Sequence, residues 1–397
     1  MQHYKPNMKF KKIAFLYTHP IQYFTPFHKI LNNLVGDRAM VFYCLDTSNG
    51  YYDNEFNQSI KWDIQLLEGY KFKFLKPSIL SKLSKKFRYY NSDVLSNLKQ
   101  TSPDIIIIHG WGYLTAIKSI ILARLLNIKI WIRGETPLSH ELKKRGVKKF
   151  IHILFLKAIF SQIDKFLVIG KENKAFYKYL CVSENKFIYA PYCVDNSDQK
   201  KKSEILPSKD SIKQQIGIPT DSFVVLFCGK LIDKKNPLDL LKAFHLAKIE
   251  NSYLLYIGDG EMQEILKNYI NKNSLDNVLM LGFKNQSEMP LYYKAASIFV
   301  LPSGLGETWG LVVNEAMNNE LPIIVSDMVG SSKDLVIEGE NGYIFPEHDI
   351  EKLSHYLTIA ANDINWLRNA GEKSKQMIQH YSYDTIITNI IKHITYN

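Results

Sequence analysis

The feature that most constrains this chain is the alternation of short apolar runs with longer amphipathic segments. In the first half, the apolar runs occupy residues 12–18, 39–45, 104–110, 128–134, 165–170 and 186–191. Between them lie segments such as residues 113–126, where apolar side chains recur at three- and four-residue steps, as on one face of a helix. Repeated strand, helix and strand predict an α/β fold built on a doubly wound parallel sheet.

The alternation stops between residues 196 and 221 and then begins again. This stretch is polar, rich in lysine and interrupted by two prolines, which is typical of a linker. The second series of apolar runs occupies residues 223–229, 252–260, 278–283, 298–303 and 322–327. We predict two Rossmann-like domains that face each other across a cleft, where open α/β sheets bind ligands. The predicted segments are a first domain (1–195), a linker (196–221), a second domain (222–375) and a C-terminal helix that returns to the first domain (376–397).

Composition and cysteine placement limit the possible classes of protein. The chain has 397 residues, of which 46% are hydrophobic and 22% charged, as in ordinary globular proteins. Its four cysteines include no Cys-x-x-Cys pair, so neither a zinc site nor a disulfide framework is indicated. The N-terminal apolar run is too short for a signal peptide, and no run reaches the roughly 18 apolar residues of a membrane span. We therefore expect a cytoplasmic protein.

The stretch PSGLGETWGLVVNEAM (residues 302–317) places two acids on either side of a predicted helix start. The helix is expected to begin near Leu311, where unpaired N–H groups and partial positive charge suit a phosphate. Glu307, in the glycine-rich loop, is positioned for sugar hydroxyls. Glu315, inside the helix, is positioned for a vicinal diol such as a ribose. Ribose, diphosphate and hexose in this order make a nucleotide-sugar.

A second phosphate-binding element precedes this stretch in FCGKLIDKKNP (residues 227–237). Lys230 directly follows the strand-end Gly229, and Lys235 lies six residues after that glycine. Two cations in a loop next to the first site would converge on a diphosphate, and lysine binds phosphate as a point charge.

These motifs resemble those of the GT-B glycosyltransferases of family four, known as glycosyl transferases group 1. The resemblance covers about 170 residues of the second half and only loosely the first half. It rests on FCGKLIDKKN, YIGDGEM, LGFKNQSEMPLYYKAASIFVLPS, GETWGLVVNEAMNNELPIIVSDMVGSSKDLV and NGYIFPEHD, in the family's order. The resemblance implies a GT-B fold and a retaining transferase that uses a nucleoside diphosphate sugar. No Asp-x-Asp motif occurs, so lysines are expected in place of a divalent cation, with neither metal nor cofactor.

The resemblance also implies a role for each matching residue of the second half. Lys230 and Lys235 would bind the diphosphate beside Gly229, Glu307 the donor hydroxyls and Glu315 the ribose. The backbone of Leu311 and Val312 would bind the distal phosphate, with Trp309 in the same donor loop. Phe283 and Lys284 lie where the family binds the base.

The first half departs from the family's pattern after two of its predicted strands. After the first strand stands YTHPIQYFTP in place of a glycine pair, and we expect His19 and Tyr23 on the acceptor side, together with Glu135. His109 and Arg133 end later strands, and we predict that they act with Glu307 as catalytic residues, because ligands gather at the carboxyl ends of parallel strands. The alternatives are a strand-end histidine that only hydrogen-bonds a loop, and an Arg133–Glu135 ion pair that caps a turn.

The net charge of +11 is concentrated in part in two basic-aromatic stretches, residues 71–90 and 141–160. Lys and Arg mixed with Leu, Ile, Phe and Tyr favour attachment to an anionic membrane surface, and a solvated helix face is the alternative. Nucleic acid binding is not favoured, because no motif for it accompanies the charge.

Together these observations predict a glycosyltransferase that moves a hexose-type sugar from a nucleoside diphosphate sugar to a lipid-linked glycan acceptor. The enzyme is expected to act peripherally at the inner face of the membrane. Two alternatives stay open at this point. One is a GT-B nucleotide-sugar epimerase, which would turn over its donor without an acceptor. The other is a non-catalytic basic protein that binds lipid or nucleic acid.

Overall fold

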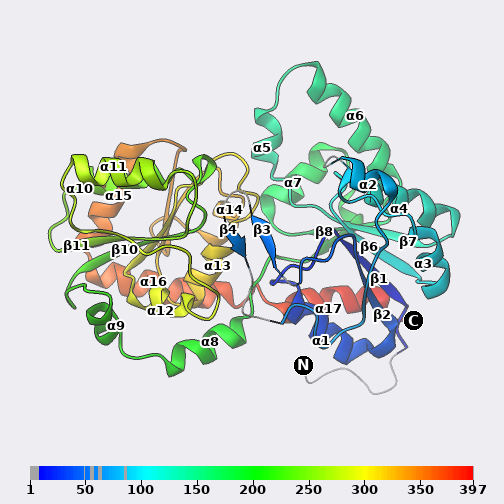
Figure 1. Ribbon diagram of the computed structural model, residues 1–397, viewed down its shortest axis with the longest axis horizontal. Coiled ribbons are helices and arrows are strands. Elements are labelled where there is room, and N and C mark those ends of the chain that lie inside the picture. The colour runs from blue at the N-terminus through cyan, green and yellow to red at the C-terminus, as the bar shows by residue number, and fades with distance from the viewer. Residues whose placement is uncertain (1–8, 49, 54–57, 61–64, 85–86, 397) are drawn as a thin grey trace. The chain divides into compact units, whose positions relative to one another are not determined.

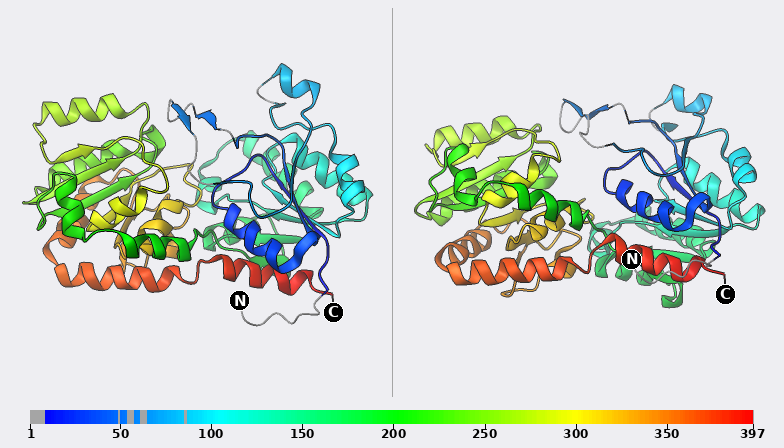
Figure 2. Two further views of the ribbon diagram at one scale, coloured as in Figure 1. Left: turned by 60° about the horizontal axis from the view of Figure 1, so that its bottom comes forward. Right: turned by 90° about the horizontal axis from the view of Figure 1, so that it is seen from below.

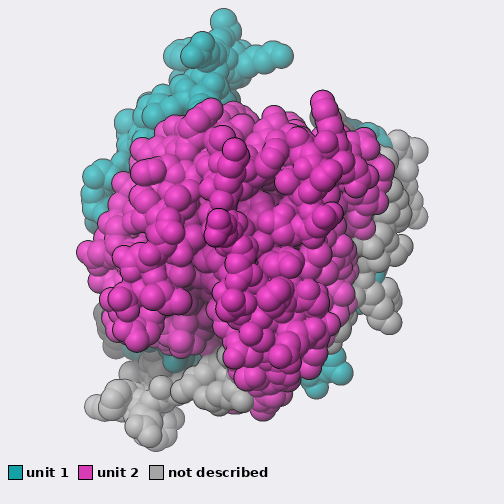
Figure 3. All heavy atoms as spheres, turned by 90° about the vertical axis from the view of Figure 1, so that its left-hand side faces the viewer, with its two compact units in different colours: residues 1–51, 64–192, 383–397 teal, residues 52–63, 193–382 magenta. Residues whose placement is uncertain are grey.

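The structure is a computed structural model that describes residues 9–396 except 49, 54–57, 61–64 and 85–86. It divides into two compact units, each with its own parallel sheet. Unit 1 comprises Met1–Tyr51, Ile64–Tyr192 and Tyr383–Asn397, and unit 2 comprises Tyr52–Asp63 and Cys193–Ser382. Figure 1 traces the chain through both, and Figure 3 shows the packed atoms of unit 2. The predicted α/β class with two Rossmann-like domains is confirmed.

Unit 1 is built on a seven-stranded sheet of order β5-β2-β1-β6-β7-β8-β9. Its strands are β1 (Ile13–Tyr17), β2 (Ala39–Tyr43), β5 (Phe72–Phe74), β6 (Ile105–His109), β7 (Lys129–Arg133), β8 (Lys165–Val168) and β9 (Phe187–Tyr189). All neighbouring strands pair in parallel, so their carboxyl ends share one edge. The register places His109 directly opposite Arg133 at that edge.

Helices cover both faces of this sheet. The unit's helices are α1 (Thr25–Val35), α2 (Ile79–Leu83), α3 (Val94–Thr101), α4 (Leu114–Leu125), α5 (Leu138–Lys143), α6 (Val147–Ser161), α7 (Lys171–Tyr179) and α17 (Tyr383–Ile394). Buried residues of α3, α4, α6 and α7 form one core with alternate strand residues such as Ile106 and Ile132. Helix α17 runs beside α1 (Figure 2), and the Tyr383 hydroxyl donates to the Tyr23 carbonyl at 2.6 Å.

Unit 2 has a six-stranded parallel sheet of order β12-β11-β10-β13-β14-β15. Its strands are β10 (Phe223–Cys228), β11 (Ser252–Ile257), β12 (Val278–Met280), β13 (Ile298–Leu301), β14 (Ile323–Ser326) and β15 (Gly342–Phe345). The longer helices are α8 (Asn196–Ile205), α9 (Lys209–Gln215), α10 (Pro237–Ala247), α11 (Gln263–Lys272), α12 (Met289–Ala295), α13 (Leu311–Asn318), α15 (Ile350–Asn362) and α16 (Ile364–Ile378), with the short α14 (Ser332–Leu335). A separate two-stranded sheet pairs β3 (Tyr51–Asp53) with β4 (Gln58–Ile60).

The stretch interpreted as a linker, residues 196–221, instead contains helices α8 and α9 and belongs to unit 2. Both helices have side-chain N-caps. Asp195 accepts from the Ser197 and Asp198 N–H groups at 3.1 and 3.0 Å, and Ser208 accepts from Ser211 N–H at 3.2 Å. Such caps satisfy N–H groups that a helix start leaves unpaired, which offsets the low apolar content of these segments.

Burial of His28 predicts that unit 1 loses stability in acid. Its Nε2 lies 3.0 Å from the Tyr17 hydroxyl, and burial lowers the pKa of His28 to about 3. Because the unfolded chain takes up a proton near pH 6.5 and the folded chain does not, stability should fall as pH decreases from about 6.5 toward 4. Chemical denaturation of His28→Gln is expected to show a smaller loss over this interval than the wild-type chain. Equal slopes in the two proteins would contradict the assignment.

Candidate functional site

In unit 2, the loops that follow β10 and β11 approach each other through their backbones. Gly229 and Gly258 have φ angles of +153° and +137°. A Cβ atom on Gly258 would lie 1.9 Å from the Gly229 carbonyl oxygen. Only glycine at Gly258 allows this approach, which fixes the path of the chain from Gly229 to Lys235.

The loop after β10 is joined to the loop after β13. Lys235 Nζ donates to Glu307 Oε2, and these two side chains are 14% and 12% exposed. Around this ion pair, the Asn236 amide donates to the Pro302 carbonyl at 3.1 Å, and Gly304 N–H donates to the Lys234 carbonyl at 2.8 Å. The structure thus brings together Lys235, which is predicted to bind the diphosphate, and Glu307, which is predicted to bind the sugar.

Helix α13 begins directly after this loop. Gly310, with φ of +87°, precedes its first residue, and a Cβ there would lie 2.8 Å from Leu301 Cδ2. Trp309 is buried, and its Nε1 donates to Asn314 Oδ1 at 2.9 Å, while its carbonyl accepts from Ser331 Oγ at 2.6 Å. Leu311 and Val312, the first helical residues, are half-buried, and the first N–H groups of a helix have no partner within it.

Glu315 lies one turn farther into α13 and is 2% exposed. Its Oε2 accepts from the Tyr293 hydroxyl of α12 at 2.8 Å, which orients the carboxylate. Burial raises the pKa of the Cys228 thiol to about 12, and the nearby charge of Glu315 contributes in the same direction. Since Cys228 ends β10, the carboxylate of Glu315 lies next to the strand that leads into the Gly229 loop.

The remaining predicted donor residues lie in the same set of loops. Lys230 is half-buried directly after Gly229, and Phe283 and Lys284 follow β12. Lys284 Nζ lies 5.7 Å from the centre of the Tyr292 ring and 3.8 Å from Glu288 Oε1. Every predicted donor-side residue of unit 2 therefore lies at or just beyond the carboxyl edge of one parallel sheet.

In unit 1, His109 and Arg133 end neighbouring strands. The ring of His109 lies 3.9 Å from the Tyr17 ring and 5.0 Å from the Phe24 ring, measured between centroids. Burial, and then the charge of Arg133, hold the pKa of His109 well below its ordinary value, so its imidazole is neutral at physiological pH.

Arg133 is 3% exposed and is held inside unit 1. Its Nη1 donates to the Ala190 carbonyl at 2.8 Å, and its Cζ lies 4.6 Å from the Tyr192 ring centre. The Tyr192 hydroxyl donates to Glu135. Burial raises the pKa of Glu135, and the charge of Arg133 opposes that shift. These contacts link the three side chains within unit 1 and hold the guanidinium of Arg133 in place.

The two predicted acceptor-side residues after β1 are half-buried. His19 Nδ1 lies 2.9 Å from Thr18 Oγ1, and burial, with a smaller effect of Arg88, lowers the pKa of His19. Tyr23 is joined through its carbonyl to Tyr383 of α17.

Comparison with known proteins identifies the family. The family described as glycosyl transferases group 1 matches residues 208–377. The UDP-Gal:α-D-GlcNAc-diphosphoundecaprenol α-1,3-galactosyltransferase of Escherichia coli is 30% identical over 275 residues, which cover 67% of this chain and 68% of that protein. The chain belongs to the glycosyl transferases group 1 family. In this glycosyltransferase, the region that matches the family covers most of unit 2, where the predicted donor residues lie.

Solved structures share the fold of this glycosyltransferase. The sucrose-phosphate synthase of Thermosynechococcus elongatus superposes with a TM-score of 0.71 at 19% identity, covering 96% of this chain and 97% of that one. Anabaena HepE in complex with UDP gives a TM-score of 0.72 at 16% identity, covering 96% and 99%. The GT-B fold predicted from the motifs is thus confirmed.

Sequence reasoning missed Tyr293, Tyr192 and Asn236. Tyr293 holds Glu315 from another helix, Tyr192 packs on Arg133, and Asn236 joins the two donor loops. Asn236 had a local signal, because it immediately precedes the Pro237 that starts α10. The two tyrosines are distant in sequence from the residues they contact, and no local pattern marks them.

Proposed function

We propose that this glycosyltransferase moves a hexose-type sugar from a nucleoside diphosphate sugar to a lipid-linked glycan acceptor, in the assembly of a surface polysaccharide or glycoconjugate. The observation that carries the proposal is the Lys235–Glu307 ion pair, which lies between the loop after β10 and the loop that leads into α13. The E. coli relative, a UDP-Gal:α-D-GlcNAc-diphosphoundecaprenol galactosyltransferase, supports a UDP-sugar donor and a diphospholipid acceptor, and Anabaena HepE has been solved with UDP-glucose.

The proposed diphosphate site consists of Lys230, Lys235 and the backbone of Leu311 and Val312. An ammonium group has three N–H donors, so Lys235 can keep Glu307 as a partner and still donate to a phosphate oxygen. These groups would offset the negative charge that grows on the leaving diphosphate as the glycosidic bond breaks. We propose that the lysines supply this charge in place of a divalent cation, so that added chelator leaves the rate unchanged.

Glu307 and Glu315 are proposed to bind the two sugars of the donor. Glu307 would accept from hydroxyls of the transferred hexose. Glu315, oriented by Tyr293, would accept from the ribose, while Phe283 and Lys284 would contact the base. Trp309 and Gly229 would support the donor through the loops they shape.

We also propose transfer with retention at the anomeric carbon. The acceptor oxygen would attack the face from which the diphosphate leaves, and a phosphate oxygen would take its proton. His109, neutral through its low pKa, is better suited to accept a hydrogen bond than to act as an acid. The catalytic roles of His109 and Arg133, and the acceptor-side roles of His19, Tyr23 and Glu135, stay predictions.

A donor screen followed by a transfer assay tests this proposal. Nucleoside diphosphate sugars that bind only the folded chain should raise its melting temperature, and the donor with the largest shift is then supplied with a lipid-linked glycan diphosphate. Product NMR should show the donor's anomeric configuration in the new linkage. Epimerisation of the donor without acceptor would favour the epimerase alternative. Anion binding with no donor preference would favour a non-catalytic protein.

Lys235→Ala is expected to weaken nucleoside diphosphate binding by about 1.5–3 kcal/mol, the range for hydrogen bonds to a charged group. Isothermal titration calorimetry measures this loss. The matched control is Lys234→Ala, because Lys234 is the exposed neighbour in the same turn and should leave the affinity nearly unchanged. Equal affinities for the wild-type chain and Lys235→Ala would contradict the phosphate role.

A further inference from the structure

Helix α6 presents a stripe of large apolar side chains to solvent. Val147, Phe150, Ile151, Leu154 and Phe155 are 75%, 63%, 60%, 51% and 44% exposed. At about 100° per residue they fall within an arc of about 140° on the helix surface. A contiguous exposed apolar patch of this kind marks an interaction site.

Cations border this stripe on both sides. At the same helical spacing, Lys148 and Lys157 lie about 20° beyond its two edges. Residues 142–161 contain six lysines and arginines and no acidic residue. The six cations are Lys143, Lys144, Arg145, Lys148, Lys149 and Lys157, and Lys144 pairs with Glu141 at 2.7 Å.

The stripe belongs to a helix that is firmly attached at its C-terminal end. Leu156, Ile159 and Phe160 are buried, and the Phe160 ring meets the Trp111 ring edge-on at 5.1 Å. Figure 1 shows α6 at the rim of unit 1. Its exposed face is therefore an ordered part of the fold.

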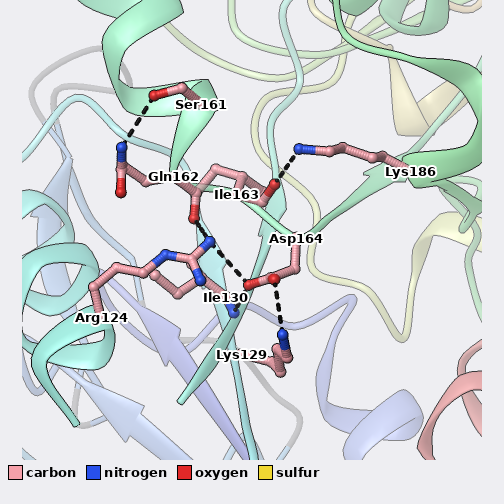
Figure 4. A network of polar contacts seen from close by, with 8 residues as sticks. All are labelled: Arg124, Lys129, Ile130, Ser161, Gln162, Ile163, Asp164 and Lys186. Atoms are coloured by element: carbon pink, nitrogen blue, oxygen red, sulfur yellow. Dashed lines mark hydrogen bonds and ion pairs between the residues drawn. The ribbon is translucent and has the colours of Figure 1, made fainter. Parts of the chain in front are cut away.

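Polar contacts just beyond the helix add to this attachment (Figure 4). Arg124 donates to the Gln162 carbonyl, and Lys186 donates to the Ile163 carbonyl at 2.9 Å. Asp164 accepts from the Ile130 N–H at 2.8 Å, which ties this segment to β7. Cations at the last carbonyls of a helix stabilise its C-terminus.

We propose that α6 docks this chain onto an anionic lipid bilayer, with its apolar stripe in the headgroup–acyl boundary and its flanking lysines at lipid phosphates. The charge decides between possible occupants. A second copy packed through the same face would place six cations against six cations, whereas anionic lipid headgroups complement them. The inference rests on the proposed function, because the anionic bilayer is the surface that would hold a lipid-linked acceptor.

The other basic stretch, residues 71–90, is a weaker basis for docking. Residues 85 and 86 lie outside the described part of the chain, and α2 exposes Ile79 and Leu80 over a much shorter length. Among the described residues, no helix is long and apolar enough to cross a bilayer. Attachment through α6 would thus be peripheral.

Vesicle flotation tests the proposal without donor or acceptor. The wild-type chain should float with vesicles of equimolar phosphatidylglycerol and phosphatidylcholine at low salt, and much less with phosphatidylcholine alone. Lys148→Gln/Lys157→Gln should lower partitioning roughly 30-fold, from about 1 kcal/mol for each cation at the surface. Ile151→Ser/Leu154→Ser should lower it at least tenfold, since both side chains lose their apolar contact.

Matched controls come from exposed positions of unit 2. Ile205→Ser/Ile364→Ser removes two apolar side chains that are 84% and 79% exposed, and Lys267→Gln/Lys272→Gln removes two cations of α11. Both should float like the wild-type chain. A Phe150→Trp variant should show a blue-shifted emission on anionic vesicles, which reports insertion of α6 itself.

Three results would overturn the docking proposal. The wild-type chain could stay unbound with anionic vesicles at low salt, or the α6 variants could float as well as their controls. A wild-type dimer that Ile151→Ser/Leu154→Ser converts to monomer, with no vesicle binding, would make the stripe an interface between copies.

Two further results separate docking from the proposed function. A chain that floats but transfers no sugar contradicts only the proposed function. One that transfers to a water-soluble acceptor without floating contradicts only the docking.

Discussion

Glu307→Ala is expected to lower the rate of sugar transfer by roughly a hundredfold or more, because the side chain is proposed to contact the hexose most strongly in the transition state. The structure adds a second reason. Glu307 accepts from Lys235, and both side chains are largely buried, so the alanine variant also leaves that ammonium without its carboxylate. Steady-state kinetics with saturating donor and acceptor measure the loss.

Binding separates the two contributions. In Glu307→Ala, the Lys235 ammonium no longer divides its hydrogen bonds between Glu307 and a phosphate oxygen. Affinity for the bare nucleoside diphosphate should therefore be unchanged or higher, while transfer is lost. Glu307→Gln keeps an oxygen acceptor but no charge and should fall between alanine and wild type. Glu340→Ala, which removes an exposed acid paired with Lys373, is the control and should transfer normally. A folded Glu307→Ala protein with the wild-type rate would remove Glu307 from the mechanism.

The two sheets could be predicted because their strands are apolar on both faces. Runs such as Ile105–Ile108 are buried at every position, as in a parallel sheet covered by helices, and the intervening helical periodicity gave the crossovers. Strands β3, β4, β5 and β15 were missed, because each is a short segment bounded or interrupted by polar residues, glycine or proline, so no extended apolar run marked it. Equally short strands such as β12 were predicted because they lie within longer apolar runs. The α8–α9 region was missed because composition was weighed above the capping residues Asp195 and Ser208.

The donor residues could be placed on one edge for a similar reason. Parallel strands end on the same side, so residues that follow β10, β12 and β13 gather there however far apart they lie in sequence. The partners within that edge depend on packing between elements. The Lys235–Glu307 contact joins two loops, and the Tyr293–Glu315 contact joins two helices, so neither follows from local pattern. The burial of Arg133 between aromatic rings is likewise a product of tertiary packing.

Gly258→Ala is expected to destabilise unit 2 by about 3 kcal/mol or more, because two costs add at this position. Its φ of +137° is strained for any side chain, and the new Cβ would lie 1.9 Å from the Gly229 carbonyl oxygen and 2.9 Å from its carbonyl carbon. The backbone has little freedom to yield. Gly258 N–H donates to the Gly282 carbonyl at 2.9 Å, and Gly229 N–H donates to the Ile257 carbonyl at 2.9 Å.

Calorimetry should therefore show the unit 2 transition of Gly258→Ala about 6 °C or more below that of the wild-type chain. Gly339→Ala is the matched control, because Gly339 has a φ of +77° in the same unit but open space where its Cβ would lie. It should show the conformational cost alone, about 1 kcal/mol. The remaining folded Gly258→Ala protein should also bind nucleoside diphosphate more weakly, since relief of the clash requires the Gly229 backbone, and with it Lys230, to shift. Equal melting of the two variants would mean that the close approach of these loops does not hold the proposed diphosphate site in place.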